Sequence, residues 1–315
     1  MAEIIRKATR DSYGEALVEL GKEYEDLLVL VADLADATKV EWFKKAYPER
    51  FFDCGIAEAN MMAVAAGLAS TGKKVFASSF AMFAAGRAYE IIRNSIGYPH
   101  LPVKIGATHA GISVGEDGAS HQCCEDIALM RTIPGMTVIN PADDIEAKAA
   151  VKASMTLDGP VYLRFGRLAV PVINDNPDYK FEIGKGILLK DGTDLTIVAT
   201  GLMVNEAIEA AKILEADGIN ARVINIHTIK PLDTEIICKA ATDTKLIITA
   251  EEHSVIGGLG SAVADTVTGC CPCKVVKIGV QDVFGHSGPA LKLLKEFGLS
   301  AENIAEQAKQ AFQNK

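Results

Sequence analysis

The sequence predicts an α/β fold of two domains, of which the first is built on a parallel sheet. Short apolar runs alternate with longer segments of helical pattern along most of the 315 residues, and this alternation is typical of parallel sheets covered by helices. The rhythm stops after residue 167, where LAVPVINDNPDYKFEIGKG carries two Pro, two Asn and several charges. It then resumes, so we expect a domain at 1–170, a linker at 171–192 and a smaller α/β domain at 193–315.

The elements of the first domain follow from the pattern of apolar residues. Residues 11–25 have a helical pattern and open the chain. The run LLVLVADL at 27–34 is apolar nearly throughout, which is typical of a strand buried on both faces. Segment 57–70 has Ala, Met, Val or Leu on almost every side, so we expect a buried helix there. Further strands are expected at 50–53, 73–77, 101–107, 136–139 and 161–164, and further helices at 80–96, 123–131 and 142–155.

The second domain repeats this alternation. Strands are expected at 195–199, 222–226, 245–250 and 274–278, and helices at 202–216, 258–268 and 287–296. A last helix should start after Ser300, because Ser is a favoured N-cap and Glu302 and Asn303 suit the first turn.

Composition argues against several classes of protein. The net charge is −9 and the 32 basic residues are scattered along the chain, which disfavours nucleic-acid binding. No apolar run approaches the ~20 residues of a membrane span. The N-terminus is charged and lacks the apolar region of a signal peptide, and the seven Cys are an odd number in a chain large enough for its own core. We therefore expect a cytoplasmic protein with reduced thiols.

A polar, glycine-rich loop is expected at 109–121, reading HAGISVGEDGASH. It follows an apolar strand, and ligands in open α/β sheets bind at the carboxyl ends of strands. The two His suit acid/base chemistry on a polar substrate such as a sugar, whereas their spacing is not that of a zinc site. The alternative is a surface loop with solvated side chains. The candidate functional residues of the loop are His109, Glu116, Asp117, Ser120 and His121.

Glu58 is a second candidate, in FDCGIAEAN at 52–60. Gly55 permits a turn, and Glu58 then lies at the start of the apolar helix. A carboxylate among apolar side chains is rarely buried without a partner, so a functional role is one of two interpretations that the sequence supports equally. The alternative is that Glu58 only complements the positive end of the helix. Phe80 and Phe83 share a helix face at i and i+3, either as core residues or as a platform for a flat heterocycle.

Three further features carry less weight. Arg164 ends an apolar strand, where it would bind an anion or form a salt bridge, and Arg10 is a second candidate cation. The glycine-rich turn in EEHSVIGGLGSAVAD at 251–265 suits either an anion at a helix N-terminus or close helix–strand packing. The CCPC cluster at 270–273 lacks the second Cys pair of a zinc site, so a redox or metal role is disfavoured.

These motifs together resemble the transketolase family of thiamine-diphosphate enzymes. GIAEAN is similar to the family motif G-I-x-E, and HAGISVGEDGASHQ is similar to its loop H-D-S-I-x-x-G-E-D-G-P-T-H-Q. SFAMFAAGRA and NPAD (140–143) follow in the family's order, and EEHSVIGGLGSAVAD and DVFGHSG (282–288) resemble its C-terminal domain. The match begins at ATR (8–10) and covers the later two of the family's three domains. The implied fold is a thiamine-diphosphate pyrimidine-binding domain followed by the transketolase C-terminal domain.

The resemblance implies that several candidates contact thiamine diphosphate. Glu58 would hydrogen-bond a nitrogen of the pyrimidine ring and favour the imino tautomer, which takes the thiazolium proton. Phe80 and Phe83 would flank that ring, and Asp33 matches a family aspartate near the thiazolium. A departure is Ala77, where many transketolases carry a third aromatic residue.

The resemblance also implies residues that bind the substrate. His109, Asp117 and His121 would bind hydroxyl groups of the donor sugar, and the two His would move protons. Arg10 and Arg164 match arginines that hold the sugar phosphate. The implied catalytic residues are thus Glu58, His109 and His121, and none of the candidates is implied to be a metal ligand.

The family binds the diphosphate through Mg²⁺ on an N-terminal domain that has no counterpart in this sequence. The resemblance is therefore to the C-terminal subunit of a split transketolase. A separate N-terminal subunit would hold the diphosphate and Mg²⁺ (or Ca²⁺), with the active site between the chains of a homodimer or heterotetramer. The implied reaction moves a two-carbon ketol unit from a ketose phosphate to an aldose phosphate, by default in the pentose phosphate pathway. Ala37, near the position of a phosphate-binding serine, leaves the acceptor open.

Three alternatives remain open. The beta subunit of a 2-oxo-acid dehydrogenase has the same two domains, although the polar loop with its two His suits a sugar better. A deoxyxylulose-phosphate-synthase-like enzyme is the second alternative. A non-catalytic regulatory subunit is the third, and the joint presence of Glu58, His109, Asp117 and His121 argues against it.

Overall fold

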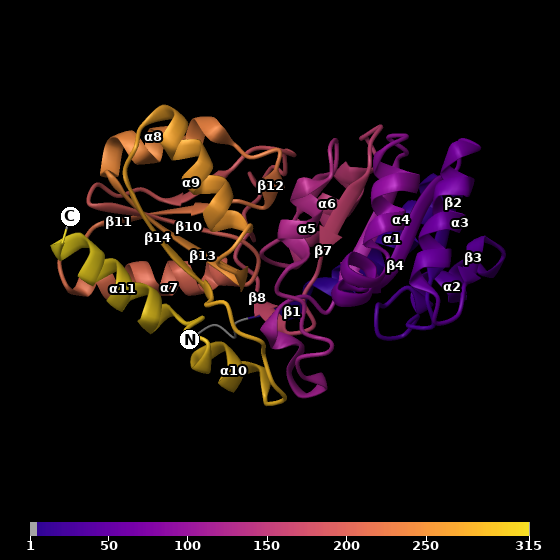
Figure 1. The fold of residues 1–315 in the computed structure, drawn as a ribbon, viewed down its shortest axis with the longest axis horizontal. Helices are drawn as coiled ribbons and strands as arrows, with labels where there is room; N and C mark the ends of the chain where they lie inside the picture. Colours follow the sequence, from indigo (N-terminus) through magenta and orange to yellow (C-terminus); the bar gives the residue numbers. More distant parts are fainter. Residues whose placement is uncertain (1–4, 315) are drawn as a thin grey trace.

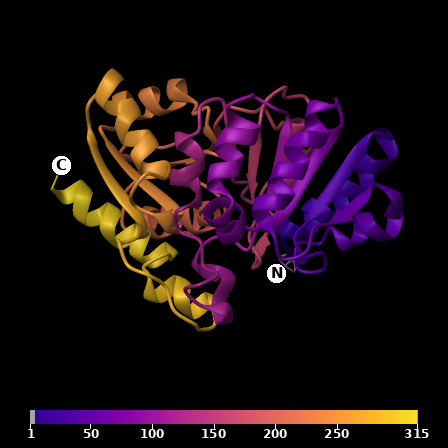
Figure 2. The same cartoon turned by 45° about the vertical axis from the view of Figure 1, so that its right-hand side comes forward.

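The computed structural model describes residues 5–314. Figure 1 shows two sheets side by side, one from the indigo and magenta part of the chain and one mainly from the orange part. Figure 2, turned by 45°, shows helices over both. The predicted α/β fold class is confirmed, and the chain contains two main β-sheets. Among residues 5–314, none of the helices combines the length and the apolar character needed to cross a membrane.

A seven-stranded sheet forms the centre of the first domain, in the order β12-β6-β7-β5-β4-β2-β3. Its strands are β2 (Leu27–Val31), β3 (Phe51–Asp53), β4 (Lys74–Phe80), β5 (Val103–Thr108), β6 (Thr137–Ile139), β7 (Val161–Arg164) and β12 (Thr228–Lys230). Neighbouring strands pair in parallel except β12 with β6. Helices cover both faces, which explains why β5 and β7 are buried along their whole length.

The helices of the first domain fall into two layers with separate cores. The layer that packs over Tyr13 and Phe43 contains α1 (Thr9–Glu23), α2 (Glu41–Ala46) and α6 (Asp144–Ser154). The opposite layer contains α3 (Glu58–Ser70), the π-helical turn η2 (Met82–Arg87), α4 (Tyr89–Ile91), the π-helical turn η3 (Ile92–Gly97) and α5 (Asp126–Thr132). The 3-10 turns are η1 (Pro48–Arg50) and η4 (Ile112–Asp117).

A five-stranded sheet forms the second domain, in the order β14-β13-β10-β11-β9. Its strands are β9 (Ile187–Lys190), β10 (Leu195–Ala199), β11 (Ala221–Asn225), β13 (Leu246–Ser254) and β14 (Lys274–Val280). The helices are α7 (Met203–Ala216), α8 (Thr234–Thr244), α9 (Leu259–Cys270), α10 (Ala290–Glu296) and α11 (Ala301–Gln313). In Figure 1, α7 and α11 lie on one face of this sheet and α8 and α9 on the other. Ser300 is the N-cap of α11, as predicted, and its side chain accepts a hydrogen bond from Asn303 N at 3.4 Å.

The two domains share structure at their junction. Strand β12 follows β11 in the chain but does not join the second sheet. It pairs antiparallel with β6 at the edge of the first sheet. The apolar core on the α3 side of the first sheet continues into the second domain through Val198, Ile237 and Val263. A small sheet of β1 (Arg6–Ala8) and β8 (Ala169–Pro171) joins the two ends of the first domain. The segment 171–192, predicted as a linker, contains β9, which pairs with β11.

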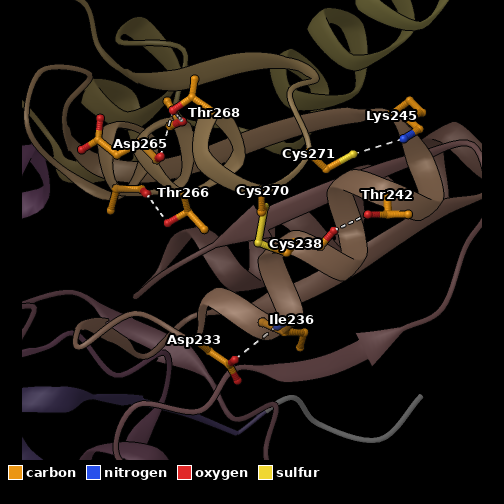
Figure 3. The surroundings of a disulfide bond; sticks show 12 residues. Asp233, Ile236, Cys238, Thr242, Lys245, Asp265, Thr266, Thr268, Cys270 and Cys271 are labelled. Carbon is orange, nitrogen blue, oxygen red and sulfur yellow. Dashed lines mark hydrogen bonds between the residues drawn. A yellow bond between two sulfur atoms is a disulfide. The ribbon is translucent and has the colours of Figure 1, made fainter.

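A disulfide bond contradicts the expectation that all thiols are reduced. Cys238 on α8 is bonded to Cys270 at the end of α9, with their Cα atoms 6.0 Å apart. This separation is typical of a disulfide and results from the side-by-side packing of the two helices. Figure 3 shows the bond and the neighbouring contact of Cys271, whose Sγ lies 3.2 Å from Lys245 Nζ. The C-terminal end of α9 is therefore joined to the middle of α8 by a covalent bond at Cys238, and to the end of α8 by a polar contact at Lys245.

Candidate active site

Glu58 is buried at the start of the apolar helix α3. The strand β3 ends at Asp53, a turn with Gly55 at φ 67° follows, and Glu58 opens the helix with 1% of its side chain exposed. Arg87 donates a hydrogen bond to Glu58 Oε2, with Nη1 at 2.7 Å. The carboxylate is therefore buried with a charged partner, as a carboxylate in an apolar setting requires.

The aromatic residues do not share a regular helix, contrary to the prediction. Phe80 is the last residue of β4, and Phe83 lies in the π-helical turn η2 that follows. The two rings nevertheless stack, with centroids 5.8 Å apart and an angle of 18° between their planes. The Phe80 ring also stacks on His109 at 3.8 Å, and the edge of His121 meets Phe83 at 5.2 Å. The structure thus brings together four of the predicted site residues.

His109 is a neutral imidazole with a defined tautomer. It follows β5 directly, and its φ of 56° turns the chain away from the sheet. Nη1 of Arg10 lies 3.0 Å from His109 Nε2, and a guanidinium can only donate, so Nε2 accepts. Nδ1 therefore carries the proton and donates to Thr108 Oγ1 at 2.9 Å. Burial, with the positive charges of Arg10 and Arg167 nearby, lowers the pKa of His109 to about 3.

The loop from His109 to His121 is fixed by the second domain. Ser113 N donates to Glu252 Oε1 at 2.6 Å, and Gln122 Nε2 donates to the carbonyl of His286 at 3.0 Å. Figure 2 shows the magenta loop against the yellow helix α10 at the lower edge of the molecule. The predicted motifs EEHSVIGGLGSAVAD and DVFGHSG therefore have a structural role, because they hold the loop.

The polar residues at the outer end of the loop lie toward solvent. Asp117 is exposed, and Ser120 Oγ lies 2.9 Å from His121 Nδ1. Glu116 is also exposed and pairs with Arg167, with Nη1 at 3.0 Å. Asp33 is exposed as well, and its backbone N–H donates to Asp53 Oδ1 at 2.9 Å, next to the turn that leads to Glu58.

Arg164 is not placed to bind a sugar phosphate, contrary to the prediction. Only 2% of the residue is exposed, and its Nε donates to Asp126 Oδ2 at 2.8 Å. Its Nη2 donates to the carbonyls of Glu252 at 2.9 Å and Cys123 at 3.3 Å. The alternative of an internal salt bridge is what the structure shows. The reason is that the second domain covers this end of β7.

Arg167 is the residue that the sequence reasoning missed. It belongs to the same motif, VYLRFGR, but lies beyond the end of β7 and is partly exposed. Its Nη1 donates to the carbonyl of Val114, and its charge acts on both Arg10 and His109. Arg10 itself donates to the carbonyl of Ala37 at 3.0 Å, and its buried Nε makes no hydrogen bond but lies 3.9 Å from Asp11 Oδ1. Arg10 and Arg167 are therefore two cations whose charges both act on His109.

The glycine-rich turn before α9 does not offer an anion site. The Glu251 carboxylate accepts hydrogen bonds from the backbone N–H groups of Leu259 at 2.6 Å and Gly260 at 2.8 Å. A Cβ on Gly258 would lie 2.0 Å from Glu251 Oε2. The positive end of the helix is thus filled by the chain's own carboxylate, and the close packing proposed as the alternative explains the glycine.

Comparison with known proteins identifies the family. The model of the transketolase pyrimidine-binding domain matches residues 6–172, and that of the transketolase C-terminal domain matches residues 184–304. The chain belongs to the transketolase family. A Methanocaldococcus jannaschii protein assigned as a transketolase C-terminal section is 54% identical over 96% of this chain and 96% of its own length.

Two further relatives extend the comparison. A 6-deoxy-6-sulfo-D-fructose transketolase subunit of Clostridium sp. is 42% identical over 97% of this chain and 95% of its own length. A solved structure of a split-gene transketolase, an inactive beta4 tetramer, has a TM-score of 0.90 at 55% identity and covers 97% of this chain and 98% of its own. This transketolase-family chain is therefore similar along nearly its whole length to proteins that consist of the two later domains.

The site fits one end of thiamine diphosphate, the cofactor of the family. A buried carboxylate and a stacked aromatic pair, which are linked because Arg87 contacts both Glu58 and Phe83, suit an aminopyrimidine ring, which is flat and carries hydrogen-bonding nitrogens. Residues 5–314 contain no group of three or more His, Cys, Asp or Glu side chains arranged to hold a metal ion.

Proposed function

We propose that this chain is the C-terminal subunit of a two-chain transketolase, which transfers a two-carbon ketol unit from a ketose phosphate to an aldose phosphate. The observation that carries the proposal is the ring cluster of Phe80, Phe83, His109 and His121, to which Glu58 is linked through Arg87, at the carboxyl ends of parallel strands. It joins a buried carboxylate and an aromatic platform to two imidazoles, a combination that suits a heterocyclic cofactor beside a polyhydroxylated substrate.

Each cofactor-facing residue has a proposed task. Glu58 would hold a hydrogen-bonding nitrogen of the pyrimidine ring, and Phe80 and Phe83 would border that ring. Asp33 would lie toward the thiazolium. The cofactor supplies the electron sink for the reaction when it is bound.

The second set of proposed residues would face the substrate, and His109 is the first of them. Its neutral Nε2 is able to exchange a proton with a sugar hydroxyl once Arg10 turns toward an anion. His121 would be the second acid/base group, and Asp117 would accept hydrogen bonds from sugar hydroxyls. We propose Arg10 with Arg167, in place of Arg164, as the residues that hold the phosphate group.

A separate N-terminal chain is part of the proposal. It would bring the diphosphate site with Mg²⁺ or Ca²⁺, and the pair would form a heterotetramer in the cytoplasm. Support comes from three large apolar side chains that lie close to Glu58 in the chain and face solvent: Phe52, Ile56 and Val64 are 43%, 76% and 39% exposed. Exposed apolar side chains near a site are typical of a subunit interface.

The substrate pair is proposed as phosphorylated pentoses, within the pentose phosphate pathway. The Clostridium relative is named for a sulfonated sugar, and a sulfonate would meet the same two cations. The choice between phosphate and sulfonate therefore depends on the space around Arg10 and Arg167.

The test is a ketol-transfer assay with xylulose 5-phosphate, ribose 5-phosphate, thiamine diphosphate and Mg²⁺. It is run on this chain alone and on the complex with the chain that co-purifies with it. Activity in the complex alone supports the proposal, and activity of the single chain contradicts the division of the site between chains. Glu58→Gln should abolish turnover in the complex. Normal activity of that variant would overturn the assignment of the cofactor.

A further inference from the structure

Arg87 connects two groups that the proposed site needs. Its Nη1 lies 2.7 Å from Glu58 Oε2, and its guanidinium carbon lies 4.6 Å from the centroid of the Phe83 ring. Glu58 opens α3, whereas Phe83 and Arg87 belong to the π-helical turn η2. The two groups thus come from separate segments, and one guanidinium contacts both.

The chemistry of the guanidinium suits both contacts at once. Its planar face packs on an aromatic ring while its edge donates to a carboxylate. The lysine ammonium is a point charge and lacks this flat shape. Arg87 is half-exposed whereas Glu58 is buried, so the cation reaches the carboxylate from the solvent side. Glu58 Oε2 is then engaged, and the other carboxylate oxygen is left to meet a ligand.

The backbone around Arg87 is also constrained. A Cβ on Gly86 would lie 2.2 Å from the terminal carbon of Met82, so the Met82 side chain fills the space beside this glycine. The Phe83 ring also contacts the rings of Phe80 and His121. The turn that carries Arg87 is therefore packed against its neighbours, among them α3.

We propose that Arg87 is a positioning residue, which holds the Glu58 carboxylate and the Phe83 ring in one fixed relation so that both engage a flat nitrogen heterocycle together. This inference rests on the proposed function, because the heterocycle is the aminopyrimidine of thiamine diphosphate. Arg87 acts through Glu58 and Phe83 and is not itself a catalytic residue.

The test uses the two-chain complex with Arg87→Met and Arg87→Lys. Two readouts do not depend on turnover: the Kd of thiamine diphosphate by calorimetry, and the exchange of the thiazolium proton for deuterium by NMR without substrate. Loss of a charge-assisted hydrogen bond at a buried carboxylate should slow the exchange and weaken cofactor binding about 10- to 100-fold. The KM of the sugar should change less than about twofold, because Arg87 contacts Glu58 and Phe83 and not the residues proposed to bind the sugar.

The Lys variant and a matched control complete the design. Arg87→Lys keeps the charge without the flat shape, so it should recover part of the exchange rate but less than the wild type. Arg93→Met is the control, since Arg93 is an exposed arginine on the next turn that contacts Asn94. It should leave both readouts unchanged.

Several results would overturn the inference. Unchanged proton exchange and cofactor Kd in Arg87→Met would show that Arg87 has no positioning role. Tighter cofactor binding in that variant would show that Arg87 competes with the cofactor instead. Failure of the proposed function would give a different result, namely normal activity of Glu58→Gln. That result does not depend on the behaviour of the Arg87 variants.

Discussion

The backbone N–H of Ser113 donates to the Glu252 carboxylate at 2.6 Å, across the junction of the two domains. Glu252 is fully enclosed, and burial raises its pKa to about 7. The loop that carries His109 and His121 is therefore held by an acid that changes charge near neutral pH.

Replacing Glu252 with Gln should alter how stability depends on pH. The carboxyl group of a Glu in an unfolded chain has a pKa of about 4.3. The folded chain therefore binds the carboxyl proton of Glu252 more tightly than the unfolded chain does. The stabilisation from that proton is complete below about pH 4 and is lost as the pH rises through the folded pKa near 7. Relative to the wild type, E252Q should gain stability between about pH 5 and pH 8, by up to about 3 kcal/mol.

Urea unfolding of both chains at several pH values measures this effect. The comparison removes the contribution of Glu146, whose pKa burial also raises to about 7. A stability difference that stays constant over the pH range would contradict the prediction.

Variants of Arg164 and Arg167 should affect different properties. Arg164→Met should lower the stability of the fold, and Arg167→Met should weaken substrate binding. Arg164→Met leaves the buried Asp126 carboxylate without its cation, which should cost about 3–5 kcal/mol of stability. Arg167→Met removes a partly exposed side chain, so stability should change by less than about 1 kcal/mol. In the complex, Arg167→Met should instead raise the KM of a phosphorylated sugar at least about tenfold. The idea fails if the sugar KM stays at the wild-type value.

Gly118→Ala should disturb the polar loop. Gly118 has a φ of 74°, and a Cβ there would lie 2.5 Å from Ser287 Oγ. The backbone strain should cost about 1–3 kcal/mol and displace the loop from the second domain. Gly269→Ala is the matched control, because Gly269 lies in α9 with nothing within 4 Å of its Cβ position. That change should raise stability by up to about 1 kcal/mol. Thermal unfolding measures the change in stability, and the ketol-transfer rate measures the displacement of the loop. If Gly118→Ala and Gly269→Ala have the same stability and the same rate, the close packing of Gly118 on Ser287 has no role in holding the loop.

Reducing the Cys238–Cys270 bond should destabilise the second domain. The bond closes a loop with a sequence separation of 32 residues, for which the loop-entropy model gives about 3–4 kcal/mol. Unfolding with and without dithiothreitol measures the change, and Cys238→Ser in the absence of reductant should match the reduced wild type. Intact mass after alkylation reports whether the bond is present. If the wild type is equally stable with and without dithiothreitol, this result would argue against the bond.

Much of the fold could be predicted because segments buried on both faces consist of apolar residues, and such runs are visible in the sequence. The run at 27–34 and the strand at 161–164 are apolar because helices cover both faces of β2 and β7. The helix predicted at 57–70 is α3 within one residue. Glycines and polar residues in HAGISVGEDGASH similarly marked the loop that brings His109 and His121 toward Phe80 and Phe83.

The missed features depend on tertiary contacts. Strand β12 is three residues long and exists only because β6 offers an edge to pair with. Helix α8 has Thr and Asp among its apolar residues, which weakens its helical pattern. Arg164 and Arg167 look alike in VYLRFGR, and only the covering second domain decides which one is enclosed. The pairing of Cys238 with Cys270 requires the packing of α8 against α9, which spacing along the chain does not reveal.

Strand β12 has a consequence for how this chain can be divided. The boundary between the two family-model matches lies between residues 172 and 184, yet the last strand of the first sheet comes from residues 228–230. A fragment cut at the boundary would keep β6 as an open edge, which is a template for pairing with other chains. Any exchange of the first domain between relatives must therefore carry a segment of the second with it. The smallest fragment that keeps this edge of β6 paired therefore extends to residue 230.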